Sequence, residues 1–139
     1  TLSTAGSTTT INGPIVMSQG KVEAFSVVGT SGATLDTSNT WVNADCGTGG
    51  SAGDVAILLP RSSTVGAGFL LYIHDFNHNV TGVGIGFSVT ITAEVNDRAA
   101  SGGTGIGGVD AREITIAGGY LQIISNGSTG WGIVDSELS

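Results

Sequence analysis

The chain has 139 residues, of which 24 are glycine and only 11% are charged. That length suffices for one domain with a core of its own. With a net charge of −7 and four basic residues, the composition argues against nucleic-acid binding, which needs clustered Lys and Arg, and against binding to an anionic membrane surface.

The residue pattern predicts an all-β fold. Long helices need Ala, Leu, Glu, Lys and Arg at a 3.6-residue period, and no stretch supplies this. Short apolar runs separated by glycine-rich turns suggest about eight or nine short strands instead. We expect an extended N-terminal arm at 1–16 and one all-β domain at 17–139. Its antiparallel strands would form a sandwich, a jelly roll or a small barrel.

The N-terminal residues 1–14 are rich in Thr, Ser and Gly, with Leu2 and Ile11 as their only large apolar residues. This composition is typical of a disordered tail. It also suits an arm that orders only against a partner subunit. In that case Leu2, Ile11 and Ile15 would lie in a subunit interface. The sequence leaves both the disordered tail and the ordered arm open.

Seven runs before the C-terminal hairpin have strand patterns. They are Lys21–Val28, Ala33–Leu35, Thr40–Val42, Val55–Leu59, Gly68–His74, Phe87–Ala93 and Arg112–Ala117. Val55–Leu59 is apolar throughout, so we expect a strand covered on both faces and ended by Pro60. The run Phe87–Ala93 alternates, which predicts that its inward residues are Phe87, Val89, Ile91 and Ala93.

The chain ends in a predicted hairpin at 119–134. Two apolar, β-branched runs flank Asn126-Gly127, and both of these residues tolerate positive φ. We therefore expect a tight type I′ turn. Leu121 and Ile123 fall on one face of the hairpin, and Trp131 and Ile133 repeat that period across the turn. Trp131 and Ile133 are accordingly candidates for a core or a subunit interface.

This hairpin resembles a recurrent ending of β-rich modules in tailed-bacteriophage virion proteins, which occur in tail fibres, tailspikes and head-decoration proteins. Upstream runs at roughly 54–135 are also similar to these modules. They are Ile57-Leu58-Leu59-Pro60, Val65-Gly66, Leu71-Tyr72-Ile73-His74-Asp75 and Ile91-Thr92-Ala93. The resemblance implies a structural β module of the virion, which is assembled in the host cytoplasm.

Both histidines lie within His74-Asp75-Phe76-Asn77-His78-Asn79. Imidazole and carboxylate are good metal ligands, and His at i and i+4 converge on a helix. This segment has no helical pattern, and Asn and Asp commonly form turns by bonding their own backbone. We therefore expect a hairpin turn and no metal site. His74, Asp75 and His78 remain candidates for ligand contact.

No enzymatic motif stands out. A G-x-S-x-G string occurs at 49–53, but it lies in a glycine-rich loop and not between a strand and a helix, so it does not predict a nucleophile elbow. Cys46 lies in the same loop with no nearby base. The G-x-G-x-x-G string at 103–108 lacks the strand before it and the helix after it that a dinucleotide site needs, so no cofactor is expected.

Trp41 could stack on a sugar if it is exposed.

We therefore expect a non-enzymatic virion protein, in the first instance a homotrimeric capsid decoration or cement protein bound to the major capsid protein or to other virion proteins. Low charge favours burial in such an assembly. A tail-fibre or tailspike module for host attachment is the alternative. A carbohydrate-binding β-sandwich is a further one, in which Trp41 and the 74–79 turn lie near a host-surface glycan.

Overall fold

The structure, a computed structural model, describes residues 25–47, 52–78, 80, 87–94, 97, 105–106 and 111–139. The described residues are rich in strands and contain a single four-residue helix, which confirms the expected all-β class. The elements in chain order are β1 (Phe25–Val28), β2 (Ala33–Thr34), β3 (Trp41–Ala44), β4 (Val55–Leu58), α1 (Ser62–Val65), β5 (Ala67–His74), β6 (Val89–Thr92), β7 (Gly105–Ile106), β8 (Arg112–Ile114), β9 (Tyr120–Asn126) and β10 (Trp131–Glu137). The expected arm at 1–16, with Leu2, Ile11 and Ile15, lies outside the described residues.

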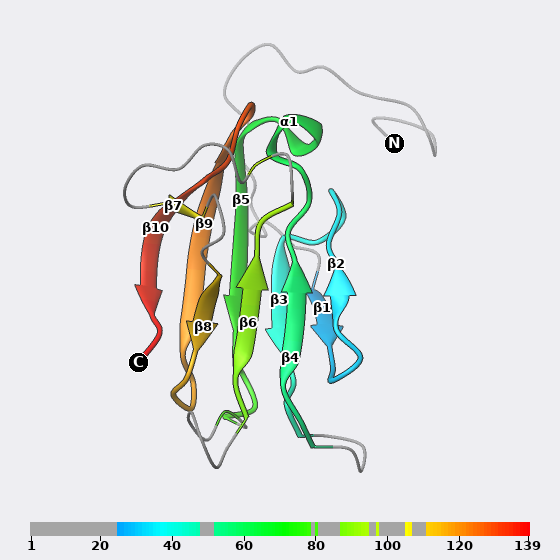
Figure 1. Cartoon of the computed structure of the whole chain (residues 1–139), viewed down its shortest axis with the longest axis vertical. Helices are drawn as coiled ribbons and strands as arrows, with labels where there is room; N and C mark the ends of the chain where they lie inside the picture. The colour runs from blue at the N-terminus through cyan, green and yellow to red at the C-terminus, as the bar shows by residue number, and fades with distance from the viewer. Residues whose placement is uncertain are drawn as a thin grey trace, which may run out of the picture.

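The strands form two sheets that lie one over the other (Figure 1). Sheet A has the order β1-β3-β5-β9-β10-β7, and sheet B has the order β2-β4-β6-β8. From β1 to β6 the chain alternates between the sheets, so that successive strands of each sheet pair in parallel. The later pairings, which involve β7 to β10, are antiparallel.

The prediction of purely antiparallel strands is therefore wrong, because half of the chain winds from one sheet to the other and back. Each turn of this winding places a strand beside its counterpart from the previous turn and in the same direction. The two sheets are not closed into a barrel.

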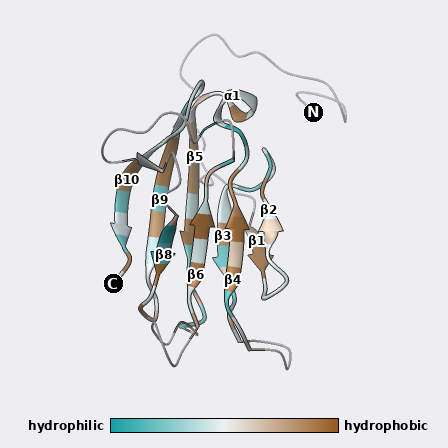
Figure 2. Cartoon of the chain, in the orientation of Figure 1, coloured by the Kyte–Doolittle hydropathy of each residue, from teal (hydrophilic) through white to brown (hydrophobic). Residues whose placement is uncertain are grey.

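One apolar core fills the space between the sheets. Sheet A contributes Val42, Leu71, Ile73, Leu121 and Ile123, and sheet B contributes Val55, Ile57, Val89, Ile91 and Ile114. Figure 2 shows the apolar colour concentrated along the central strands. Complete burial of one such side chain contributes roughly 1.5–3 kcal/mol. The inward positions of β6 are predicted correctly. The prediction that Val55–Leu59 is covered on both faces is wrong, because Ala56 is exposed.

The C-terminal hairpin forms from β9 and β10, with Ile123 opposite Ile133 and Ser125 opposite Trp131. Its loop differs from the predicted two-residue turn. Asn126 stays in β9, and its Oδ1 accepts hydrogen bonds from the backbone N–H groups of residues 128, 129 and 130 at 2.9, 2.9 and 3.1 Å. Only Gly127 takes a positive φ here, at 75°. Side-chain capping by the Asn thus replaces the type I′ turn.

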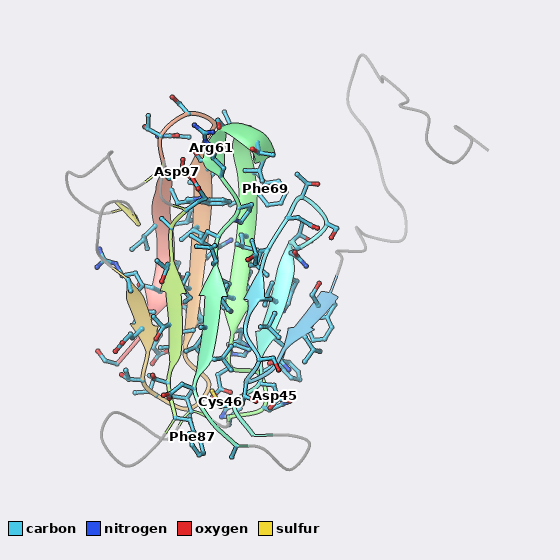
Figure 3. The ribbon with its side chains drawn as sticks, turned by 45° about the vertical axis from the view of Figure 1, so that its right-hand side comes forward. Asp45, Cys46, Arg61, Phe69, Phe87 and Asp97 are labelled. Carbon is cyan, nitrogen blue, oxygen red and sulfur yellow. The ribbon has the colours of Figure 1, made fainter. Side chains whose placement is uncertain are left out.

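Buried polar bonds attach the α1 segment to this hairpin. The Ser62 N–H donates to Asp97 Oδ2 at 2.7 Å, and Ser125 Oγ donates to the Ser62 carbonyl at 3.1 Å. Trp131 Nε1 donates to the Pro60 carbonyl at 3.2 Å. Figure 3 shows Asp97 at the α1 end of the sandwich and Cys46 at the opposite end. These bonds satisfy backbone groups that would otherwise be buried without partners.

Candidate functional site

The outward face of sheet A carries the main candidate site. Large apolar side chains that are exposed among the described residues belong to strands of this sheet or to the turn directly after β5. They are Phe25, Val27, Trp41, Leu70, Phe76, Ile124 and Val134. Apolar side chains gathered on one face, rather than scattered singly, mark a surface that meets a partner or a ligand.

Strand register aligns one row of this face across the sheet. Phe25 pairs with Trp41, Trp41 with Tyr72, Tyr72 with Gln122, and Gln122 with Asp135. Because outward positions alternate with core positions along each strand, all five residues belong to the face turned away from the core. The row therefore runs from three aromatic residues to an amide and a carboxylate.

The aromatic rings of this face contact one another. The ring centroids of Trp41 and Tyr72 are 4.7 Å apart with an interplanar angle of 56°, and those of Tyr72 and Tyr120 are 5.6 Å apart and stacked. Such pairs hold their rings in defined orientations. Trp41 remains 39% exposed, so part of its indole ring is accessible to solvent.

A groove of about 630 Å³ opens beside these rings. Its lining includes Thr40, Trp41, Gly68, Leu70, Tyr72 and Gln122. Gly68 lies at an irregularity in the pairing of β5 with β9, with a φ of 82°, and a Cβ added to it would have no neighbour within 4 Å. The groove falls in the size range of small-molecule sites, about 300–1,000 Å³.

Polar groups lie on the β9–β10 side of the same face. Tyr120 Oη donates to Asp135 Oδ2 at 2.9 Å. This hydrogen bond, with a smaller contribution from burial and from nearby carboxylates, raises the pKa of Tyr120. Burial and the charge of Asp135 raise the pKa of Tyr72. Both phenols therefore stay protonated, and can donate hydrogen bonds, throughout the neutral pH range.

A turn follows the fifth strand, but it is not the predicted hairpin turn, because β5 belongs to sheet A and the next described strand, β6, belongs to sheet B. Its three candidate residues have different roles. Asp75 is fully buried, and its Oδ2 accepts hydrogen bonds from the backbone N–H groups of Val80 and Gly118, both at 3.0 Å. Asp75 thus closes the turn, and the prediction that it contacts a ligand must be corrected, because its carboxylate points into the protein.

The two histidines both lie against Gly118. His74 Nε2 is 3.0 Å from the Gly118 carbonyl oxygen, so it carries the proton and donates, while the buried Nδ1 has no hydrogen-bond partner. His78 is exposed, and a Cβ added to Gly118 would lie 2.8 Å from its ring. His74 also contacts the rings of Tyr72 and Tyr120, which places it at the edge of the aromatic row.

Of the residues predicted for a subunit interface, two are described. Trp131 is 3% exposed, and its ring packs edge-on against Phe69 in the core. Of the two alternatives that the sequence left open for Trp131, the structure therefore supports the core and not the interface. Ile133 is partly buried and packs against the same core.

The described residues give little support for a metal site or for a nucleophilic cysteine. They contain no group of three or more His, Cys, Asp or Glu side chains that could hold a metal ion. Cys46 is buried, and burial together with nearby carboxylates raises the pKa of its thiol to about 11, so it is a poor nucleophile. Within the same residues, no helix is long and apolar enough to cross a membrane.

Trp41 and His74 were candidates from the sequence, whereas Tyr120 and the other members of the aligned row were not. Tyr72 could have been found, because it lies two positions before His74 on the same strand and thus on the same side. Tyr120 and Gln122 join only through the pairing of β9 with β5, which the local pattern does not specify.

Comparison with known proteins adds no relative to this description. No protein-family model matches the chain, and no curated protein is significantly similar to it. The function of the exposed face is therefore argued from its residues and their geometry.

Proposed function

We propose that this chain is a non-enzymatic structural module of a tailed-bacteriophage virion, and in the first instance a homotrimeric decoration or cement protein that stabilises the head. The resemblance of residues 54–135 to such modules supports this. So does a composition with 11% charged residues, which leaves much surface to be covered by neighbours in an assembly.

The observation that carries the proposal is the edge strand β1. It is the outermost strand of sheet A, and its sequence Phe-Ser-Val-Val contains no charge. Phe25 and Val27 are 57% and 60% exposed. Natural proteins usually protect an edge strand with charged residues, Pro or a covering segment, because an apolar edge invites pairing with another chain. We assign this edge to contact with a neighbouring copy.

A substitution at the edge tests this assignment. Val27→Lys places a charge on β1 and is expected to convert a trimer into monomers, since a buried unpaired ammonium group strongly disfavours the contact. The measurement is sedimentation velocity at several protein concentrations.

Val134→Lys is the matched control, because Val134 is also an exposed valine of sheet A, at 53%, but lies in β10. It should leave the trimer intact. Equal assembly of both variants and the wild type would show that β1 is not the contact.

A tail-fibre or tailspike module is the second candidate, and the winding of the chain favours it. From β1 to β6 each turn stacks on the previous one with parallel pairing. Stacked, quasi-one-dimensional architectures of this kind suit elongated structures. The number of copies per particle separates the two candidates, since hundreds indicate head decoration and a handful indicates the tail.

A further inference from the structure

We propose that the groove on the outward face of sheet A is a binding site for a neutral oligosaccharide. The site comprises Thr40, Trp41, Leu70, Tyr72 and Gln122 around the open position at Gly68. This inference goes beyond the structural role proposed above and does not depend on whether the chain forms a trimer.

The aromatic rings supply the first element of recognition. The face of an aromatic ring is electron-rich, whereas the C–H groups on the face of a pyranose carry partial positive charge, so the two surfaces are attracted to each other. Trp41 is 39% exposed, and Tyr72 contacts it at 4.7 Å between centroids. The neighbouring ring thus orients the indole while leaving part of it accessible.

Hydrogen-bonding groups supply the second element. Gln122 and Thr40 line the groove, and their amide and hydroxyl groups both donate and accept, as sugar hydroxyls require. Tyr120 and Asp135, already joined by a hydrogen bond, lie beside Gln122 in the same part of the sheet. Because Gln122 pairs with both Tyr72 and Asp135, apolar and polar groups meet directly at the groove.

The charges of the face indicate a neutral ligand. Asp135 and Glu137 lie on its β10 side in register with Gln122 and Tyr120. The two arginines in the described part of the chain, Arg61 and Arg112, belong to the α1 end and to sheet B. Among the described residues of this face, an anionic sugar would therefore meet like charge without a compensating cation. The same carboxylates would face one another if two copies packed together through this groove.

The test is a calorimetric titration of the assembled wild-type protein with four neutral probes, maltotriose, cellotriose, chitotriose and lactose, and with sialyllactose as the charged counterpart of lactose. We expect saturable binding of at least one neutral probe with a Kd of about 1 mM or below. The same probe should protect Trp41 from acrylamide quenching, because the buried Trp131 contributes little to that signal.

Variants locate the binding. Trp41→Ala should weaken it by about tenfold or more, because it removes the exposed ring. Gln122→Ala should weaken it by roughly threefold or more through the lost hydrogen bonds, and it provides the decisive comparison if Trp41→Ala does not fold. Phe76→Ala is the control, because Phe76 is an aromatic residue that is exposed, at 59%, and does not line the groove. Its binding should match that of the wild type.

Three results would overturn the proposal. The first is a flat titration with every probe, and the second is equal binding by the wild type and by a folded Gln122→Ala or Trp41→Ala variant. The third is tighter binding of sialyllactose than of lactose. If Trp41→Ala abolishes the trimer and no saccharide binds, the groove is a contact between copies. Light scattering of the same samples reports the oligomeric state separately, so failure of the sugar site is distinguishable from failure of the structural role.

Discussion

Cys46 illustrates how single residues of this fold are held in place without crosslinks. It is the only cysteine in the chain, it is fully buried, and its Sγ lies 3.7 Å from the Ser88 carbonyl oxygen. Burial disfavours the thiolate, and the charges of Asp75, Asp54 and Asp45 add to this, which raises the pKa to about 11 from 9.0. The thiol is therefore a small core side chain.

We predict that Cys46 resists alkylation in the folded protein. At pH 8.5 iodoacetamide should react at least about 100-fold more slowly with native protein than with protein in denaturant, because only the thiolate is nucleophilic. Mass spectrometry over time gives both rates. Rapid labelling of the native protein would contradict the buried, neutral thiol.

The same shift predicts the sign of a pH effect on stability. Because the pKa is raised on folding, the unfolded chain ionises first, so the free energy of unfolding should fall between about pH 9 and pH 11 and should be unaffected by this group below pH 9. Urea unfolding at pH 8, 9 and 10 measures this fall. In Cys46→Ala, which cannot ionise, the fall over that range should be smaller.

Gly127 is the residue on which the hairpin loop depends. Its φ is 75°, and a Cβ added there would lie 2.5 Å from the Ala67 backbone nitrogen. Gly127→Ala should therefore destabilise the protein by about 1–3 kcal/mol, from the unfavourable φ and from this contact. Urea unfolding measures the loss. Ser128→Ala, at the exposed neighbouring position, should change stability by no more than about 0.5 kcal/mol.

At the scale of elements, the sequence predicts where strands occur but not how they pair. Alternation over Phe87–Ala93 and over the terminal hairpin correctly identifies inward residues such as Ile91, Leu121 and Ile123. Whether two strands run parallel or antiparallel depends on which distant segment lies beside each of them. Phe25 and Trp41 lie opposite each other on parallel strands because the chain crosses to β2, in the other sheet, between β1 and β3. A period of two contains no information about that partner.

The same limit explains what was missed at the candidate site. Trp41 was identified as a sugar-stacking candidate from its residue type, and the structure places it at a groove. Alternation along its strand puts its polar neighbour Gln122 on the face opposite Leu121 and Ile123, yet only the antiparallel pairing of β5 with β9 brings Gln122 opposite Tyr72. For Trp131 the sequence left a core and a subunit interface open, because residue type alone does not distinguish a core aromatic from an interfacial one, and the structure places it in the core.

In the molecule as a whole, the inner and outer faces of the sheets differ in character. The inner faces form the core, while sheet A presents an apolar edge at β1 and an aromatic groove further along the same outward face. Few charges are available to keep such a surface in water, since the chain has 4 basic and 11 acidic residues. We therefore expect the protein to function as part of an assembly.

Light scattering coupled to size-exclusion chromatography shows whether copies of this chain associate. We expect the mass of three chains, about 41 kDa for a 13.8 kDa chain, unchanged over a hundredfold range of concentration. A mass of one chain throughout that range would contradict the homotrimer and leave the apolar edge of β1 without its proposed partner.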